Sequence, residues 1–263
     1  PFTIRCNRLK TGIEDLKRVL EEEHIDFEEG RYNEEALHIK GTSSIEDKES
    51  FKKGLYQVQD ESSMLVAHVV DPQPGEKVLD ICSAPGGKTT HMAELMNNKG
   101  EITARDIHPH KLKLVEENCK RLGIEIVKTE IFDAGKLDNK AVGCYDRVLL
   151  DAPCSGLGVI RRKPDLRWKK NPDNFEELSK LQKEMLLIAA QYVKKGGILV
   201  YSTCTINKTE NIEVVEHFLK KNSDFVMECI KGLIPEELYS ESAERGYLEM
   251  YPNTNGTDGF FIA

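Results

Sequence analysis

Residues 77–89 read Lys-Val-Leu-Asp-Ile-Cys-Ser-Ala-Pro-Gly-Gly-Lys-Thr, and this stretch decides the fold. Its apolar beginning, residues 77–81, is typical of a short buried strand, and residues 88–96 have the pattern of a helix. The two glycines between them let the backbone turn tightly and approach a ligand closely. A strand, a glycine loop and a helix in this order predict the first unit of an α/β domain.

The same alternation continues along the rest of the chain. Helices are predicted at residues 59–70, 109–122, 175–193 and 209–221, and strands at 100–105, 125–129, 145–150, 197–201 and 259–262. The last of these strands is expected at the edge of the sheet. Such alternation predicts a mostly parallel, doubly wound sheet with right-handed crossovers, formed by a domain spanning residues 51–263.

Residues 1–50 predict a separate, small α+β module. Residues 2–9 and 36–39 have the pattern of strands, and residues 12–23 that of an amphipathic helix. The polar stretch at residues 41–50 is expected to be a linker or loop.

Composition places the chain among ordinary soluble proteins. Of its 263 residues, 39% are hydrophobic and 31% charged, and no apolar run approaches the roughly 20 residues that span a bilayer. None of the seven cysteines forms a Cys-x-x-Cys pair, which predicts reduced thiols in the cytoplasm and no metal site. We expect a monomer without membrane contact. Because the first residue is Pro1, we also expect a piece of a longer protein.

The glycine loop, residues 82–88, is a candidate cofactor site because a helix N-terminus follows it with free N–H donors. Its Gly-Lys-Thr ending is similar to a phosphate-binding P-loop. That motif requires a glycine five positions before Gly87, where this chain has Cys82. S-adenosylmethionine fits better, since it has no phosphates and needs only close backbone approach. A tight glycine turn without a ligand is the alternative.

Two aspartates follow the next predicted strands. Asp106 ends the second strand of the sheet, where a carboxylate can accept hydrogen bonds from both ribose hydroxyls of a nucleoside. Asp133 follows residues 125–132 and could bond an adenine amino group. A solvated turn residue fits the spacing of Asp133 equally well.

Two cysteines each follow a predicted buried strand. Cys154 lies in residues 151–156, Asp-Ala-Pro-Cys-Ser-Gly, and Cys204 in residues 202–205, Ser-Thr-Cys-Thr. Because ligands of open α/β sheets bind outside the carboxyl ends of the strands, both thiols are expected to face one cleft. The alternative is that both are small buried hydrophobes.

Two thiols in one cleft suit covalent catalysis on a pyrimidine. C5 of cytosine is too poor a nucleophile to attack a methyl donor, but a thiolate that adds to C6 activates it. Asp151 could hold the N4/N3 edge of the base, and the second thiol could assist proton removal or product release. A helix predicted just after Cys204, with Asn207 and Glu210 spaced as a capping box, would favour that thiolate. The residues alone do not rank the two thiols.

Residues 161–170 form a basic segment in a chain of net charge −8. The acidic balance argues against a generic nucleic-acid binder. Locally, however, cations for phosphates and one aromatic ring for stacking suit an unpaired RNA strand. A solvated charged loop is the alternative. The candidate RNA-binding residues are Arg161, Arg162, Lys163, Arg167 and Trp168.

Five motifs, in this order, resemble the RNA (cytosine-5) methyltransferases. They are residues 80–89 (Asp-Ile-Cys-Ser-Ala-Pro-Gly-Gly-Lys-Thr), 150–156 (Leu-Asp-Ala-Pro-Cys-Ser-Gly), 158–168 (Gly-Val-Ile-Arg-Arg-Lys-Pro-Asp-Leu-Arg-Trp), 201–204 (Tyr-Ser-Thr-Cys) and 257–261 (Thr-Asp-Gly-Phe-Phe). The third motif is most similar to the bacterial branch that modifies small-subunit ribosomal RNA, the Sun/Fmu type. The resemblance covers residues 55–263 densely.

This resemblance implies a Rossmann-like domain that methylates C5 of a cytidine in RNA, with 16S ribosomal RNA as the expected substrate. It implies Cys204 as the nucleophile and Cys154 as the cysteine that helps to release product. Residues 1–50 resemble the RNA-binding module that precedes the catalytic domain in this family. Transfer RNA as substrate, or a catalytically silent ribosome-assembly factor, are the alternatives. The implied S-adenosylmethionine site consists of Cys82, Ser83, Ala84, Pro85, Gly86, Gly87, Lys88, Asp106, Asp133 and Asp151.

Overall fold

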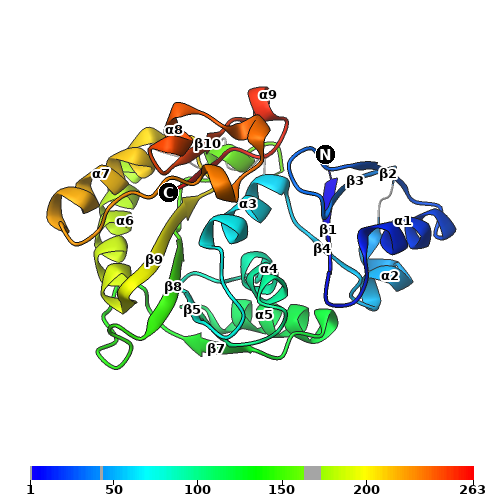
Figure 1. Ribbon diagram of the computed structural model, residues 1–263, viewed down its shortest axis with the longest axis horizontal. Helices are drawn as coiled ribbons and strands as arrows, with labels where there is room; N and C mark the ends of the chain where they lie inside the picture. The colour runs from blue at the N-terminus through cyan, green and yellow to red at the C-terminus, as the bar shows by residue number, and fades with distance from the viewer. Residues whose placement is uncertain (1, 42–43, 163–172) are drawn as a thin grey trace.

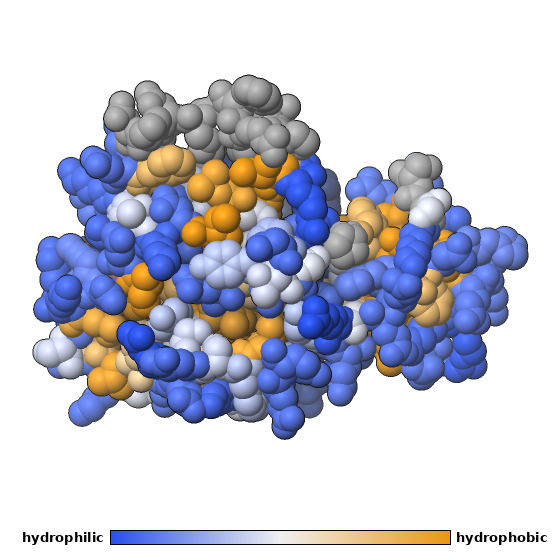
Figure 2. Space-filling view, turned by 90° about the horizontal axis from the view of Figure 1, so that it is seen from above, coloured by the Kyte–Doolittle hydropathy of each residue, from blue (hydrophilic) through white to orange (hydrophobic). Residues whose placement is uncertain are grey.

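The computed structural model describes residues 2–41, 44–162 and 173–263, which form a small and a large lobe (Figures 1 and 2). The small lobe is a four-stranded antiparallel sheet in the order β2-β3-β1-β4. Leu16 and Leu20, one helical turn apart on α1, pack with Ile4 of β1 in its core. The elements are β1 (Phe2–Cys6), α1 (Ile13–Glu22), β2 (Asp26–Glu29), β3 (Ala36–Lys40), η1 (Ile45–Asp47), α2 (Glu49–Lys52) and β4 (Tyr56–Val58).

The large lobe is built on a seven-stranded sheet in the order β10-β11-β9-β8-β5-β6-β7. Its strands are β5 (Lys77–Asp80), β6 (Glu101–Asp106), β7 (Val127–Ile131), β8 (Tyr145–Asp151), β9 (Val193–Thr203), β10 (Leu248–Met250) and β11 (Phe260–Ile262). Its helices are α3 (Glu61–Val70), α4 (Gly87–Leu95), α5 (Pro109–Leu122), α6 (Asp173–Tyr192), α7 (Ile212–Lys221), α8 (Glu241–Glu244) and α9 (Pro252–Asn255). Short 3-10 turns lie at η2 (Leu157–Val159), η4 (Lys208–Glu210), η5 (Lys231–Leu233) and η6 (Glu236–Leu238).

Helices cover both faces of the large sheet (Figure 1). Val78 of β5 faces the core shared with α3, α4 and α5, and its neighbour Leu79 faces the core shared with α6 and α7. Strands buried on both faces tend to contain continuous apolar runs, as residues 148–150 of β8 do. Strands β9, β8, β5, β6 and β7 pair in parallel, whereas β11 and β10 are antiparallel. The predicted doubly wound, mostly parallel α/β fold is therefore confirmed.

Three short strands were absent from the sequence prediction, because β2, β4 and β10 have too few residues to show a period. They form through pairing with β3, β1 and β11. The edge strands of the large sheet are therefore β10 and β7, and the prediction that residues 259–262 form the edge is wrong. The small sheet extends to Val58, beyond the predicted boundary at residue 50, and the division into domains stays a prediction. The expected linker at 41–50 contains η1 and the start of α2.

A buried ion pair joins the two lobes. Arg5 of β1 is fully buried, and its Nη2 lies 2.7 Å from Oε1 of Glu94 in α4. The same guanidinium donates hydrogen bonds to the carbonyl oxygen of Gly87 (3.0 Å) and to Thr90 Oγ1 (3.2 Å). Because removing one member of such a pair leaves an unpaired buried charge, the contact fixes the first turn of α4 against the small sheet. No helix of the described residues is long and apolar enough to cross a membrane.

Candidate functional site

The candidate site lies at the carboxyl edge of the large sheet. Asp80, Asp106 and Asp151 are the last residues of β5, β6 and β8, three strands that are neighbours in the sheet. Cys204 directly follows the end of β9, which pairs with β8 up to Asp151 and Ser202. The parallel strands thus bring together side chains that lie far apart in the sequence.

The two predicted thiols meet at this edge. Their sulfur atoms, Cys154 Sγ and Cys204 Sγ, are 3.3 Å apart and share a hydrogen bond. The loops that carry them are joined by a 2.7 Å hydrogen bond between the hydroxyls of Ser155 and Thr205. The two thiols are therefore in contact, as their positions at the strand ends predict, and that they face one cleft stays a prediction.

A close backbone approach holds the two loops in position. Gly158 donates its N–H to the carbonyl oxygen of Cys204 at 3.0 Å and accepts one from Gly259 at 2.9 Å. A Cβ atom at residue 158 would lie 1.9 Å from the carbonyl oxygen of Gly259, so only glycine fits here. The loop after Cys154 is therefore fastened both to Cys204 and to the residue that precedes β11.

The two thiols have opposite proton affinities. The hydrogen bond with Cys154 lowers the pKa of Cys204, and the Lys88 ammonium lowers it further. The pKa of Cys154 is raised well above its ordinary value by the same hydrogen bond and by burial. In this arrangement Cys204 is the better thiolate and Cys154 is the proton donor.

The helix predicted after Cys204 is divided into two parts. In place of one helix at residues 209–221, the Asn207-capped 3-10 turn η4 starts at Lys208 and the α-helix α7 starts at Ile212. Asn207 caps η4, and its side-chain amide donates a 3.1 Å hydrogen bond to Oε1 of the buried Glu210, so the expected pair is in contact. The Glu210 carboxylate accepts the backbone N–H of Ser155 at 2.7 Å and so connects the two cysteine loops. Its spacing from Asn207, read as a capping box, did not reveal this role.

A lysine–aspartate pair lies beside the thiols. Lys88 Nζ is 2.7 Å from Asp151 Oδ2, and the hydroxyl of Ser202 donates to Asp151 Oδ1 at 2.8 Å. Burial lowers the pKa of Lys88, but the Asp151 carboxylate outweighs it and the resulting pKa lies above the ordinary value. The Lys88 ammonium also lies 4.9 Å from the ring centre of Phe260. Sequence reasoning missed Ser202 and Phe260 as neighbours, because no local pattern links them to Lys88.

The glycine loop connects β5 to α4. Gly86, at φ 100°, adopts a left-handed conformation that suits glycine, and α4 starts at the next residue. Ser83 donates its N–H and its hydroxyl to the carbonyl oxygen of Arg105, at 2.9 and 3.1 Å, which ties the loop to β6. Burial raises the pKa of the Cys82 thiol, which argues against reactivity at Cys82.

The predicted cofactor carboxylates lie in sequence along the sheet edge. Asp106 is nearly buried, and its Oδ1 accepts the backbone N–H of His108 at 2.8 Å. Asp133 follows β7, and its Oδ1 accepts the N–H of Gly135 at 3.0 Å. Asp80 accepts a 2.7 Å hydrogen bond from Thr89 Oγ1, while its other oxygen is buried without a hydrogen-bond partner among the described residues. Carboxylates that can accept further hydrogen bonds fit a nucleoside that carries hydroxyl and ammonium groups.

The titration of Asp80 gives a prediction. Burial raises the pKa of this carboxyl from 3.8 to about 7. Because the unfolded chain releases this proton near pH 3.8 and the folded chain retains it, the contribution to stability falls as pH rises from about 4 to about 7 and is constant above. Asp80→Asn should remove this fall and make the cofactor-free variant more stable than the parent at pH 8, by on the order of a few kcal/mol.

Urea unfolding of the parent and of Asp80→Asn at pH 5 and pH 8 measures the pH dependence of the free energy of unfolding. Asp133→Asn, a partly exposed aspartate outside the thiol cluster, is the control and should keep the pH dependence of the parent. The prediction is contradicted if Asp80→Asn loses as much stability from pH 5 to pH 8 as the parent does.

The structure describes only two of the five predicted RNA-binding residues, Arg161 and Arg162. Arg162 forms ion pairs with Asp60 (2.6 Å) and Asp258 (2.5 Å), and Arg161 with Asp258 (3.2 Å). These contacts bind η2 and its neighbours to α3 and to the loop before β11, so both arginines have a structural role. The other candidates, Lys163, Arg167 and Trp168, lie outside the described residues.

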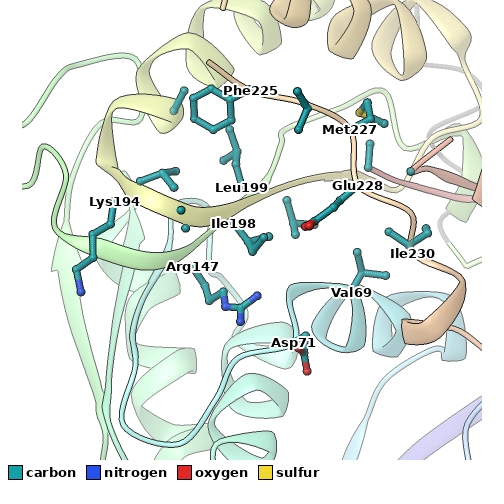
Figure 3. A pocket seen from close by; sticks show the side chains of 18 of the residues that line it. Val69, Asp71, Arg147, Lys194, Ile198, Leu199, Phe225, Met227, Glu228 and Ile230 are labelled. Atoms are coloured by element: carbon teal, nitrogen blue, oxygen red, sulfur yellow. The ribbon is translucent and has the colours of Figure 1, made fainter. Parts of the chain in front are cut away.

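A cavity in the described part of the chain lies away from the thiols (Figure 3). Its volume is about 920 Å³, and it is lined by the first part of β9 and by residues 224–230. The Arg147 guanidinium at this cavity is held by Glu76 at 3.0 Å. Neither thiol is among the lining residues. We therefore place the candidate site at the thiols and not in this cavity.

The fold and the paired strand-end thiols define a Rossmann-like methyltransferase class. A model of the family "16S rRNA methyltransferase RsmB/F" matches residues 67–263. The chain belongs to this family.

Relatives and solved structures agree with this assignment. The chain is 45% identical over 266 residues to the probable ribosomal RNA small subunit methyltransferase B of Bacillus subtilis, covering 99% of this chain and 58% of the relative. It is 39% identical over 277 residues to the human 28S rRNA (cytosine(4447)-C(5))-methyltransferase, covering 100% of this chain and 34% of the relative. The chain thus spans little more than half of the bacterial protein that it matches.

Two crystal structures extend the comparison to three dimensions. PH0851 superposes with a TM-score of 0.93 at 39% identity, covering 100% of this chain and 58% of that one. NSun6 from Pyrococcus horikoshii, solved with SFG, superposes with a TM-score of 0.85 at 26% identity, covering 100% of this chain and 89% of that one. Both matches include the small lobe as well as the large one.

Proposed function

We propose that this chain transfers a methyl group from S-adenosylmethionine to C5 of a cytidine in 16S ribosomal RNA, through a covalent bond between Cys204 and C6 of the base. The observation that carries the proposal is the 3.3 Å separation of the Cys154 and Cys204 sulfurs beside the Lys88–Asp151 pair. Small-subunit RNA is favoured by the family and by the names of the bacterial relatives.

The cofactor would lie along the carboxyl ends of β5, β6 and β7. The loop at residues 82–88 would receive it through the backbone, Asp106 would accept the ribose hydroxyls and Asp133 the adenine amino group. The unpartnered oxygen of Asp80 offers an acceptor for an ammonium group at the same edge. When bound, S-adenosylmethionine supplies the methyl group.

The chain's own groups would move the electrons and protons. The Cys204 thiolate attacks C6, the S–C6 bond forms, and the electron pair of the C5–C6 double bond becomes available at C5 for the methyl group. A base then removes the C5 proton, the double bond re-forms and the thiolate leaves. Cys154, within hydrogen-bond reach of Cys204, is placed to assist this release.

Asp151 would hold the target base during these steps. Its carboxylate is fixed by Lys88 and Ser202, so it can accept a hydrogen bond from the cytosine N4 amino group without reorienting. A base inside a helix cannot reach such a position, which favours an unpaired or flipped cytidine. The small lobe and the basic segment 161–170 would bind the surrounding RNA.

Transfer from labelled S-adenosylmethionine to small-subunit, large-subunit and transfer RNA, followed by nucleoside analysis, tests the proposal. We expect 5-methylcytidine in the small-subunit RNA. Cys229→Ala, which removes an exposed cysteine, is the control and should keep parental activity. Methylation of transfer RNA alone would support the proposed reaction but contradict the proposed substrate. Cofactor binding without transfer to any of the three RNAs would overturn the reaction for this chain.

A further inference from the structure

Two histidines and a glutamate converge at the junction of the two lobes. Glu35 precedes β3 in the small lobe, His68 lies on α3, and His91 lies on α4. Glu35 Oε1 is 2.7 Å from His68 Nε2 and 3.1 Å from His91 Nε2. The three ligand atoms all lie within 4.8 Å of one another. Donor atoms that share one tetrahedral Zn²⁺ at about 2.0–2.2 Å are roughly 3.3–3.6 Å apart, so small side-chain shifts would let them share an ion.

Burial and charge at this junction favour a cation. Glu35 and His91 are 6% and 2% exposed, while His68 is partly exposed and opens the cluster to solvent. The nearby Arg5 guanidinium already makes two contacts with the Glu94 carboxylate, at 2.7 and 3.2 Å. The Glu35 carboxylate therefore has imidazoles, and no lysine or arginine, as its ion-pairing partners among the described residues. A buried carboxylate in such surroundings gains from a bound cation.

The donor types select the kind of ion. Two imidazole nitrogens and one carboxylate oxygen suit Zn²⁺ and related transition metals, whereas Mg²⁺ and Ca²⁺ prefer oxygen ligands throughout. We propose that Glu35, His68 and His91 form a binding site for a divalent transition-metal ion such as Zn²⁺, which would cross-link the small lobe to α3 and α4. Water that enters past His68 would complete the coordination.

The proposal goes beyond methyl transfer and does not depend on it. None of the three ligands belongs to the candidate site around Cys154 and Cys204. An ion bound here would hold the small lobe against the large lobe. It also departs from the expectation of no metal site, which rested on local motifs. Residues 35, 68 and 91 form no such motif, since their meeting depends on the tertiary fold.

Co²⁺ and Zn²⁺ binding to the whole chain tests the site. We expect one ion per chain, a four- or five-coordinate Co²⁺ spectrum without thiolate charge-transfer bands, and a Tm that rises with Zn²⁺ and not with Mg²⁺. Thiolate bands would locate the ion at the cysteines instead. No binding of either transition metal at micromolar protein concentration would overturn the proposal.

His68→Gln is the decisive variant, because it keeps a hydrogen-bond donor for Glu35 at a partly exposed position. It should weaken Co²⁺ binding by about 100-fold or more, since loss of a mere hydrogen-bonding partner of a ligand already costs about 10–100-fold. His38→Gln is the matched control, since His38 meets Glu61 at the same 2.7 Å distance in a pair without a third ligand. Glu35→Gln, which keeps the size of the side chain, should also lose binding. Parental affinity in both His68→Gln and Glu35→Gln would refute the site.

Discussion

Replacing Cys204 with alanine should abolish methyl transfer while leaving S-adenosylmethionine binding intact. The substitution removes the sulfur that has the lowered pKa in the pair, and without it C5 is not activated. Loss of a nucleophile that acts with partners as one unit typically lowers turnover by at least about 10⁴-fold. Single-turnover transfer of labelled methyl groups and calorimetric titration of the cofactor measure the two quantities separately.

Two outcomes would contradict the assignment. Parental turnover by Cys204→Ala would show that this thiol does not attack the base. Loss of cofactor binding together with activity would show that the substitution disturbs the edge of the sheet, and would remove the support for covalent catalysis. Cys119→Ala, which removes a buried cysteine of α5 far from the thiol pair in the sequence, controls for general effects and should remain active.

Replacing Cys154 with alanine should trap a covalent protein–RNA adduct. Cys154 is in hydrogen-bond contact with Cys204, and its raised pKa favours the protonated thiol, so its loss leaves the nucleophile in place and removes the group that assists release. With RNA and S-adenosylmethionine present, we expect a slow-migrating band on a denaturing gel and little multiple turnover. The band should carry both the labelled methyl group and the RNA.

The double substitution distinguishes the two thiols. Cys154→Ala combined with Cys204→Ala should form no adduct, because the attacking sulfur is then absent. If Cys154 is the nucleophile instead, the pattern reverses, and Cys204→Ala alone accumulates the adduct. The absence of an adduct in both single variants would show that Cys154 does not act in release.

The long elements were predictable from the sequence for one physical reason. Strands β5 and β8 are buried on both faces by helices and contain the apolar runs Val78-Leu79 and Val148-Leu149-Leu150, and the helix α5 was predicted with its observed bounds. The short strands β2, β4 and β10 carry no period of their own and exist through pairing. The predicted start of α7 is three residues early because residues 208–210 form a 3-10 turn, which Asn211, at φ −114° and ψ −107°, separates from the helix.

Those residues of the candidate site that lie at the ends of strands were predictable from the sequence. Cys154 and Cys204 could be placed together because parallel strands end at one edge of the sheet. The cause of thiolate formation could not be predicted, since it depends on the distance between the two sulfurs and on Lys88, which lies on a different element, α4. The buried role of Glu210 and the cluster of Glu35 with two histidines were equally out of reach, because tertiary contacts create them.

The Arg5–Glu94 pair has a consequence for recombining this chain with its relatives. A chimera that takes its small lobe from one parent and its large lobe from another inherits the two charges separately. If either parent has a neutral residue at its own position, the hybrid buries an unpaired charge, at a cost of about 3–5 kcal/mol. Crossovers between the lobes should therefore be chosen so that β1 and α4 come from the same parent, although 88 residues separate Arg5 from Glu94 in the sequence.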